Sequence, residues 1–120
     1  MTTNTLSWFE IFVTDMKRAQ GFYEQVLDTK LRTEAFMGEP HAIFAADGVA
    51  GALVQRKDRK PSKEGALVYL NCNGRLDGVL SRVAKAGGQV VMPKTDIGQP
   101  GFIAIVADSE GNAVGLHSER

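Results

Sequence analysis

The chain opens with a pattern that predicts a β-strand, because residues 6–13 alternate between two sides of an extended backbone. One side is apolar throughout and consists of Phe9, Ile11 and Val13. The other side consists of Leu6, Trp8, Glu10 and Phe12. Both sides are mostly apolar, so we expect a strand that is covered on both faces.

A helix is predicted next, with Asp15 as its N-cap. Its apolar positions recur at helical spacing and are Met16, Ala19, Tyr23, Val26 and Leu27. Three short strands follow over 31–36, 41–47 and 51–56, separated by Gly-Glu-Pro and Asp-Gly turns. The first half of the chain therefore indicates the order β-α-β-β-β.

The second half repeats this order. A strand over 66–72 precedes a helix over 75–88, which we expect to end at the Gly87-Gly88 pair. Three more strands are predicted over 89–93, 101–108 and 113–118. The turn at 47–53 also resembles the turn at 110–116. The repeated order of elements and the similar turns together indicate an internal duplication of about 60 residues.

These patterns predict an α+β fold in a single domain over 1–120. It is made of two tandem βαβββ modules, about 5–56 and 66–118, joined by a polar linker at 57–65. The linker, "KDRKPSKEG", is either a basic binding patch or a solvated connection. The pattern favours the solvated connection, because acids are mixed with the bases and no aromatic residue is interleaved.

Composition narrows the possible functions. Lys and Arg number 14, equal to Asp and Glu, so no basic face for nucleic acid is expected. The longest apolar runs are too short for a membrane span, and the first ten residues do not have the pattern of a signal peptide. A single cysteine, Cys72, excludes a disulfide within the chain and favours a cytoplasmic location.

Two long stretches resemble the vicinal oxygen chelate superfamily, which includes glyoxalases, bleomycin resistance proteins and extradiol dioxygenases. They are "FEIFVTDMKRAQGFYEQVLDTKL" and "AKAGGQVVMPKTDIGQPGFIAIVADSEGNAVGLHS". The resemblance implies that the modules form a curved mixed sheet, whose concave side is a cup for a small molecule. It also implies a homodimer, in which each cup joins the first module of one chain to the second module of the other.

The resemblance implies four positions for metal ligands, which are His, Gln or Glu in the metal-binding relatives. Here they are occupied by Trp8, by a residue at or next to Ala52, by Gly115 and by either Leu67 or Val68, of which periodicity favours Leu67. None of these side chains offers the oxygen or imidazole ligands that divalent metals require. The sequence therefore predicts no metal and no other cofactor, and it argues against a glyoxalase I or an extradiol dioxygenase.

Strand alternation then predicts which side chains line the cup. They are Trp8, Glu10, Phe12, Tyr69, Asn71 and His117. Glu10 either has a functional role or stabilises the cup wall through a salt bridge or a hydrogen bond, and His117 is either functional or a solvated histidine. His41 is interpreted as an exposed edge residue, and Lys94 as a turn residue rather than an anion ligand.

Three functions remain open. The first is a metal-independent small-molecule binding protein, with Trp8, Phe12, Tyr69 and Asn71 as the substrate-binding residues. The second is a lyase or other enzyme, with Glu10 and His117 as a catalytic acid–base pair or a non-standard metal site. The third is a non-catalytic scaffold whose cup is filled by its own side chains.

Overall fold

The computed structural model describes residues 5–120, and its elements follow the order βαβββ twice. The first module contains β1 (Trp8–Phe12), α1 (Met16–Leu27), β2 (Arg32–Phe36), β3 (Glu39–Phe44) and β4 (Ala50–Val54). The second contains β5 (Tyr69–Asn71), α2 (Leu76–Arg82), β6 (Gln89–Asp96), β7 (Phe102–Ala107) and β8 (Ala113–Ser118). The predicted α+β class and element order are confirmed.

Hydrogen bonding divides the strands into two mixed sheets of four strands each, in the orders β1-β4-β3-β2 and β5-β8-β7-β6. In each sheet the first strand of the module pairs in parallel with the last, and all other pairs are antiparallel. Equivalent strands thus occupy equivalent places in the two sheets, although the β6–β7 pair has register shifts on either side of Met92 that the β2–β3 pair does not have.

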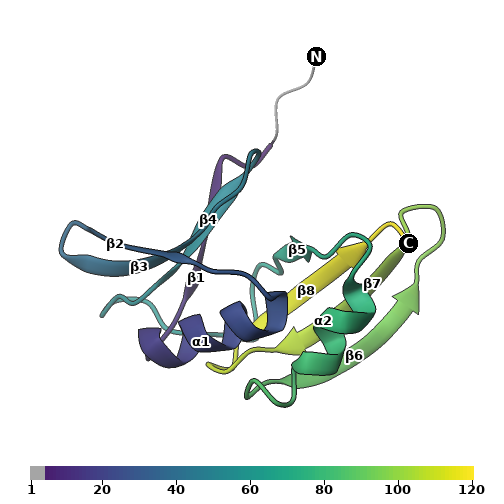
Figure 1. Cartoon of the computed structure of the whole chain (residues 1–120). Coiled ribbons are helices and arrows are strands. Elements are labelled where there is room, and N and C mark those ends of the chain that lie inside the picture. The colour runs from purple at the N-terminus through teal and green to yellow at the C-terminus, as the bar shows by residue number, and fades with distance from the viewer. Residues whose placement is uncertain (1–4) are drawn as a thin grey trace.

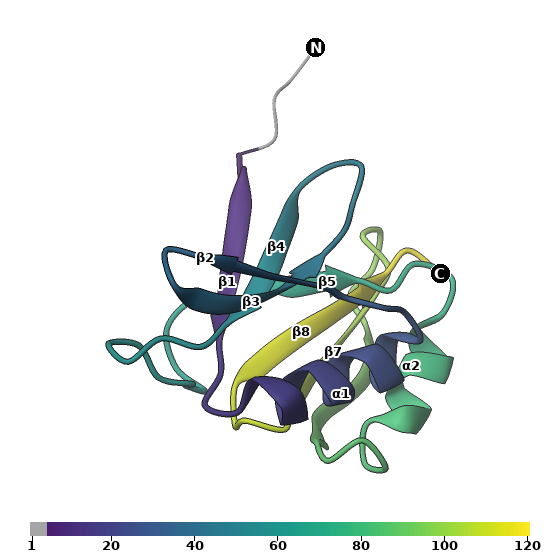
Figure 2. The same cartoon turned by 60° about the vertical axis from the view of Figure 1, so that its left-hand side comes forward.

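The two helices lie next to each other on one side of the molecule (Figures 1 and 2). The helix α1 begins as predicted, because the Asp15 carboxylate accepts a hydrogen bond from the Arg18 amide at 3.0 Å. Its buried side chains join residues of both modules in one hydrophobic core. Within residues 5–120, no helix is long and apolar enough to cross a membrane.

The pleat of β1 sends alternate side chains to opposite faces of the first sheet. Phe9 and Ile11 face the shared core with α1. Phe12 faces the other way and packs in a second cluster with Ile43, Ala52 and Val54. Trp8 and Glu10 share this second face, which we call the cup face of the first module.

Some boundaries differ from those predicted. The strand predicted over 66–72 is shorter in the structure and covers only residues 69–71. At the start of β8, the Ala113 amide donates a hydrogen bond to the Ser62 carbonyl in the linker rather than to a residue of the predicted strand. The strand predicted over 89–93 extends to Asp96, so Lys94 lies in β6 and pairs with Asp77 at 3.2 Å instead of occupying a turn.

The second helix also ends earlier than predicted, at Arg82 rather than at the glycine pair. Gly88 serves close packing instead. A Cβ atom there would lie 2.5 Å from the Ala107 carbonyl oxygen and 2.6 Å from the Phe22 ring. The glycine therefore lets β6 approach both α1 and β7, and a larger side chain would force them apart.

Candidate functional site

A cavity of about 300 Å³ lies on the cup face of the first module. Apolar and charged side chains from four strands, the β2–β3 turn and the residues after β4 line it: Trp8, Glu10, Phe36, Met37, Glu39, His41, Val54 and Arg56. Apolar walls with a few convergent polar groups are typical of small-molecule sites. This cavity is the candidate functional site.

His41 is the buried polar residue of this site, with 7% of its surface exposed. Its Nδ1 lies 3.0 Å from the Glu39 carbonyl oxygen, which can only accept, so Nδ1 carries a hydrogen. In the neutral ring Nε2 then carries the lone pair, and it lies 3.9 Å from Glu10 Oε2. The ring of Phe36 meets the imidazole edge to face at 4.9 Å and fixes its orientation.

The Glu10 side chain is held less tightly than that of His41. Its Oε2 accepts one hydrogen bond, from Trp8 Nε1 at 3.3 Å, and its side chain is 30% exposed. A carboxylate has acceptor sites for about four hydrogen bonds. Glu10 therefore retains capacity to bind a donor group of a ligand beside the Trp8 ring.

The expectation that His41 is an exposed edge residue is wrong. The strand β3 is interior to its sheet, and His41 pairs with Glu34 on one side and Val54 on the other. A preceding Gly-Glu-Pro turn suggested an edge, yet the position of a strand within a sheet depends on partners distant in sequence. The signal available was alternation, since His41 and Ile43 share one side of the strand.

The other predicted cup residues lie on the second sheet. Tyr69 and Asn71 on β5 pair with Gly115 and His117 on β8, which places all four on one face. His117 Nε2 donates to the Pro100 carbonyl at 2.7 Å, and the Asn71 side chain accepts from the Asn73 amide at 2.9 Å. Local backbone therefore already engages one atom of each polar side chain.

Among residues 5–120, the cavities beside Glu10 do not reach the cup residues predicted on the second module. Glu10 lines cavities of about 210 and 300 Å³, and neither includes Tyr69, Asn71 or His117. Tyr69 and Asn71 line a separate cavity of about 360 Å³ between β5 and the end of α1. The structure thus brings Glu10 together with Trp8 and His41, but not with His117.

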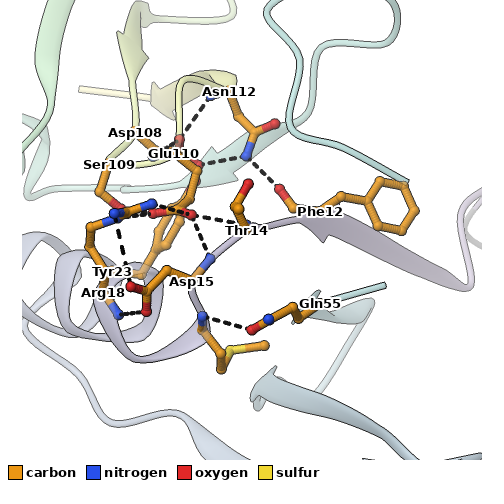
Figure 3. Close-up of polar contacts among 11 residues, drawn as sticks. Phe12, Thr14, Asp15, Arg18, Tyr23, Gln55, Asp108, Ser109, Glu110 and Asn112 are labelled. Atoms are coloured by element: carbon orange, nitrogen blue, oxygen red, sulfur yellow. Dashed lines mark hydrogen bonds and ion pairs between the residues drawn. The ribbon is translucent and has the colours of Figure 1, made fainter. Parts of the chain in front are cut away.

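The turn at 108–112 has a role that the sequence did not reveal (Figure 3). The Glu110 carboxylate accepts from the amides of Thr14 and Asp15, both at 2.9 Å, and from Arg18 Nε at 2.6 Å. Burial alone would raise the pKa of Glu110, but these hydrogen bonds outweigh it and lower the pKa to about 2. The second module thereby holds the two residues that precede α1 and the Arg18 side chain of its first turn.

Neighbouring side chains of this turn complete the junction. The Tyr23 hydroxyl donates to Asp108 at 2.6 Å, and burial together with that carboxylate raises the pKa of Tyr23 well above 10. Asn112 donates to the Phe12 carbonyl at 2.9 Å and accepts from the Ser62 amide at 2.8 Å. Each group is satisfied within the protein, so this network holds the modules together rather than forming a site.

The other end of α1 is also bound by the second module. Arg75 donates to the Leu27 carbonyl at 2.6 Å, and Arg82 donates to the Val26 carbonyl at 3.1 Å. Cationic donors at the last carbonyls of a helix satisfy groups that have no partner within the helix. Both ends of α1 therefore depend on residues more than 45 positions away in the sequence.

Comparison with known proteins identifies the family. A sequence model of the Glyoxalase/Bleomycin resistance protein/Dioxygenase superfamily matches residues 5–116. The chain belongs to this superfamily. It is 46% identical over 122 residues to "Putative glyoxylase CFP32" of Mycobacterium bovis and of Mycobacterium tuberculosis, a match that covers 93% of the chain. The chain spans 44% of the length of these curated relatives.

Solved structures of the superfamily share the fold. A glyoxalase/bleomycin resistance protein from Albidiferax ferrireducens matches with a TM-score of 0.77 at 15% identity, over 96% of this chain and 99% of its own. A genomically encoded fosfomycin resistance protein from Listeria monocytogenes matches with a TM-score of 0.68 at 11% identity, over 100% and 94%. At these identities the likeness establishes the fold alone.

The positions at which the superfamily resemblance implies metal ligands do not fit a metal here. Ala52 is fully buried against Ile43 and Val54, and the Tyr69 ring lies where a side chain at Gly115 would project. Val68 packs against the core whereas Leu67 is exposed, so Leu67 is the equivalent position on the cup side. Trp8, Ala52, Leu67 and Gly115 supply no donor for a divalent ion.

Proposed function

We propose that this superfamily member is a metal-independent protein that binds a small molecule in the cup. The observation that carries the proposal is the cavity on the first sheet, where apolar side chains surround the loosely held Glu10 carboxylate and the buried His41. An open cavity also disfavours the alternative of a scaffold whose cup is filled by its own side chains.

The lining suggests how a ligand is held. Trp8, which is 41% exposed, and Phe36 offer flat apolar surfaces for an aromatic or amphipathic molecule. Glu10 accepts a hydrogen bond from a ligand hydroxyl or amine, and His41 Nε2 lies on the same wall. Phe12 extends the apolar face toward the linker.

We further propose that a second copy of the chain completes the cup, bringing Tyr69, Asn71 and His117 opposite Trp8, Glu10 and Phe12. Large apolar side chains remain exposed on both modules, among them Met37 and Phe36 on the first and Tyr69 and Val91 on the second. Exposed apolar surface of this kind is typical of interfaces and ligand sites. In such a homodimer, the cup residues of the second module of one chain would face those of the first module of the other chain.

The decisive experiment combines metal analysis with fluorescence. The protein is purified without chelator, its metal content is measured, and aromatic small molecules are titrated while the emission of Trp8, the single tryptophan, is followed. We expect no stoichiometric metal and a binding signal that survives EDTA. Stoichiometric metal that disappears in both Glu10→Gln and His117→Ala would contradict the proposal and indicate a relocated metal site.

The same titration tests the shared cup. His117→Ala is expected to weaken ligand binding several-fold in the dimer, because a buried contact is lost from the opposite wall. Ultracentrifugation of the wild-type protein measures the association state. If the protein is a monomer and His117→Ala does not change its ligand affinity, the shared cup is contradicted and the first module alone forms the site.

A second candidate is an enzyme that transfers a proton. The specific observation in its favour is the fixed Nδ1 hydrogen of His41, which leaves Nε2 as a base beside Glu10. The acid–base pair expected from the sequence, Glu10 with His117, requires the second copy. Ligands found by fluorescence are then incubated with the protein and analysed by mass spectrometry. A chemical change that is lost in His41→Gln supports the enzyme, and unchanged ligand supports the binder.

A cytoplasmic location remains part of the proposal. Cys72 is a free, fully buried thiol, and burial raises its pKa. A buried neutral thiol that forms no disulfide suits a reducing compartment. Fractionation of the native host, with immunodetection of the protein, tests this location directly.

A further inference from the structure

A second and larger cavity adjoins the candidate site. Its volume is about 870 Å³, and it is lined by the segment 55–60 after β4, by residues 38–40 at the start of β3, and by Val13 and Thr14. Glu39 and Arg56 line both this cavity and the Trp8 cavity. The two hollows therefore share a wall on the first module.

The charges of the larger cavity are unequal. Its lining carries four cations, at Arg56, Lys57, Arg59 and Lys60, against the two carboxylates of Glu39 and Asp58. Both carboxylates pair with Arg56 Nε, at 3.6 and 3.1 Å respectively. Within residues 5–120, Lys57, Arg59 and Lys60 have no ion pair, so an excess positive charge surrounds this hollow.

Two contacts connect these cations to the cup face. The Arg59 guanidinium lies over the Phe12 ring, 5.9 Å from its centre, and Phe12 belongs to the apolar cluster of that face. Lys60 also lines a small cavity together with Glu10 and Phe12. The basic segment that the sequence suggested to be a solvated linker thus borders the ligand-binding face.

We propose that the natural ligand is an amphipathic anion, with an apolar or aromatic body in the Trp8 cavity and its anionic group against Lys57, Arg59 and Lys60. This inference rests on the proposed function and names the ligand class. Cationic side chains around a hollow concentrate anions and bind phosphate, sulfonate or carboxylate oxygens.

Charges that belong to only one of the two cavities determine the direction in which such a ligand lies. The paired Glu39 and Arg56 line both cavities and do not distinguish them. Of the two cavities, Glu10 lines only the Trp8 cavity, where an anionic group would be repelled. The three unpaired cations line only the larger cavity, where the same group is attracted. A ligand with one charged end is therefore bound in one orientation, with its uncharged end near Glu10.

Two probes of nearly identical shape test the proposal. One is 8-anilinonaphthalene-1-sulfonate, and the other is N-phenyl-1-naphthylamine, which has the same aromatic body without the sulfonate. Each is titrated into the full chain, and energy transfer from Trp8 reports binding near the site. We expect the sulfonate to bind about tenfold more tightly than the neutral probe, and inorganic phosphate to compete with the sulfonate alone.

Charge reversals locate the anion site. Lys57→Glu and Lys60→Glu are expected to remove most of the tenfold preference while leaving the neutral probe within about twofold of its wild-type affinity. Lys63→Glu is the matched control, because Lys63 belongs to the same linker and lines neither cavity. The Lys63→Glu variant should prefer the sulfonate probe to the same degree as the wild-type protein.

The outcomes separate this proposal from the proposed function. Equal binding of the two probes, or equal losses in Lys63→Glu and Lys60→Glu, would overturn the anion site and leave the cup intact. Absence of energy transfer with either probe would overturn the cup and the anion site together. Far-ultraviolet circular dichroism of each exposed-loop variant confirms that its fold is retained.

Discussion

Two glutamates of this protein differ sharply in their surroundings. The Glu110 carboxylate is fully buried and accepts hydrogen bonds from two backbone amides, the Arg18 side chain and the Ser109 hydroxyl. Glu10 is 30% exposed and accepts one long hydrogen bond from Trp8. The saturated carboxylate stabilises the junction of the modules, whereas the unsaturated one can bind a ligand.

The comparison also explains why a buried polar network is not by itself a functional site. Among residues 5–120, no fully buried side-chain polar atom lacks a partner. A ligand at the junction would have to break hydrogen bonds that are already formed. On the cup face, the proposed ligand would add a hydrogen bond to Glu10, which accepts only one from the described residues.

The largest expected effect follows from removing the saturated carboxylate. Glu110→Ala should lower the free energy of unfolding by about 3 kcal/mol, because two amides at the start of α1 and the Arg18 guanidinium lose their acceptor. Urea unfolding measures the change. Glu64→Ala, at an exposed carboxylate in the linker, is the control and should change stability by less than about 0.5 kcal/mol. A loss below about 1 kcal/mol in Glu110→Ala would show that the two glutamates do not differ as described.

The pH dependence of stability sharpens the same contrast. The pKa of Glu110 is lowered from 4.5 to about 2, so its contribution is present in full above pH 4.5 and is lost as the pH falls toward 2. The stability difference between wild type and Glu110→Gln should therefore shrink to about half between pH 7 and pH 3. Urea unfolding at both pH values gives this difference, and an unchanged gap would contradict the lowered pKa.

A smaller loss is expected at the neighbouring tyrosine. Tyr23→Phe removes the hydroxyl that donates to Asp108 but keeps the ring in the core. Hydrogen bonds to charged groups contribute about 1.5–3 kcal/mol, and Asp108 keeps its bonds from Asn112 and the Glu110 amide. We expect a loss of about 1.5 kcal/mol in thermal or urea unfolding. If Tyr23→Phe is as stable as the wild type, the hydrogen bond from Tyr23 to Asp108 does not stabilise the junction of the modules.

The smallest effect on stability is expected at the cup face. Glu10→Gln should change the free energy of unfolding by less than about 1 kcal/mol, because this carboxylate accepts one long hydrogen bond and its side chain is 30% exposed. The same variant should weaken the binding of a hydroxyl- or amine-bearing ligand by about tenfold. Unfolding and Trp8 fluorescence titrations on one preparation compare the two effects. A large loss of stability with unchanged affinity would make Glu10 a structural residue.

Local patterns were sufficient for most of the elements. Alternation predicted β1, and the spacing of apolar residues after Asp15 predicted α1 with its N-cap. The helix α2 was predicted too long, because the Gly87-Gly88 pair resembles a helix end while Gly88 serves close packing with Phe22. The family resemblance is confirmed by the match over residues 5–116.

The candidate site was predicted in part. Trp8 and Glu10 were assigned correctly to one face, because side-chain direction along a strand follows from local geometry. His41 was assigned to an exposed edge, and the structure buries it beside Glu10. The linker at 57–65 was interpreted as a solvated connection. Its residues 57–60 are exposed and also line a cavity next to the cup face.

The sequence by itself determined the order of the elements, the duplicated module and the side of each strand to which a residue belongs. The elements and the sides of the strands depend on spacings of two or 3.6 residues, which a short window of sequence reveals. The duplication follows from the recurrence of the same order of elements in the second half of the chain. Only the tertiary structure decided that Glu110 binds the amide of the N-cap residue Asp15, 95 residues earlier, and that Glu10 faces His41 rather than His117. Such contacts depend on how the two modules pack, and packing is a property of the whole chain that no local repeat encodes.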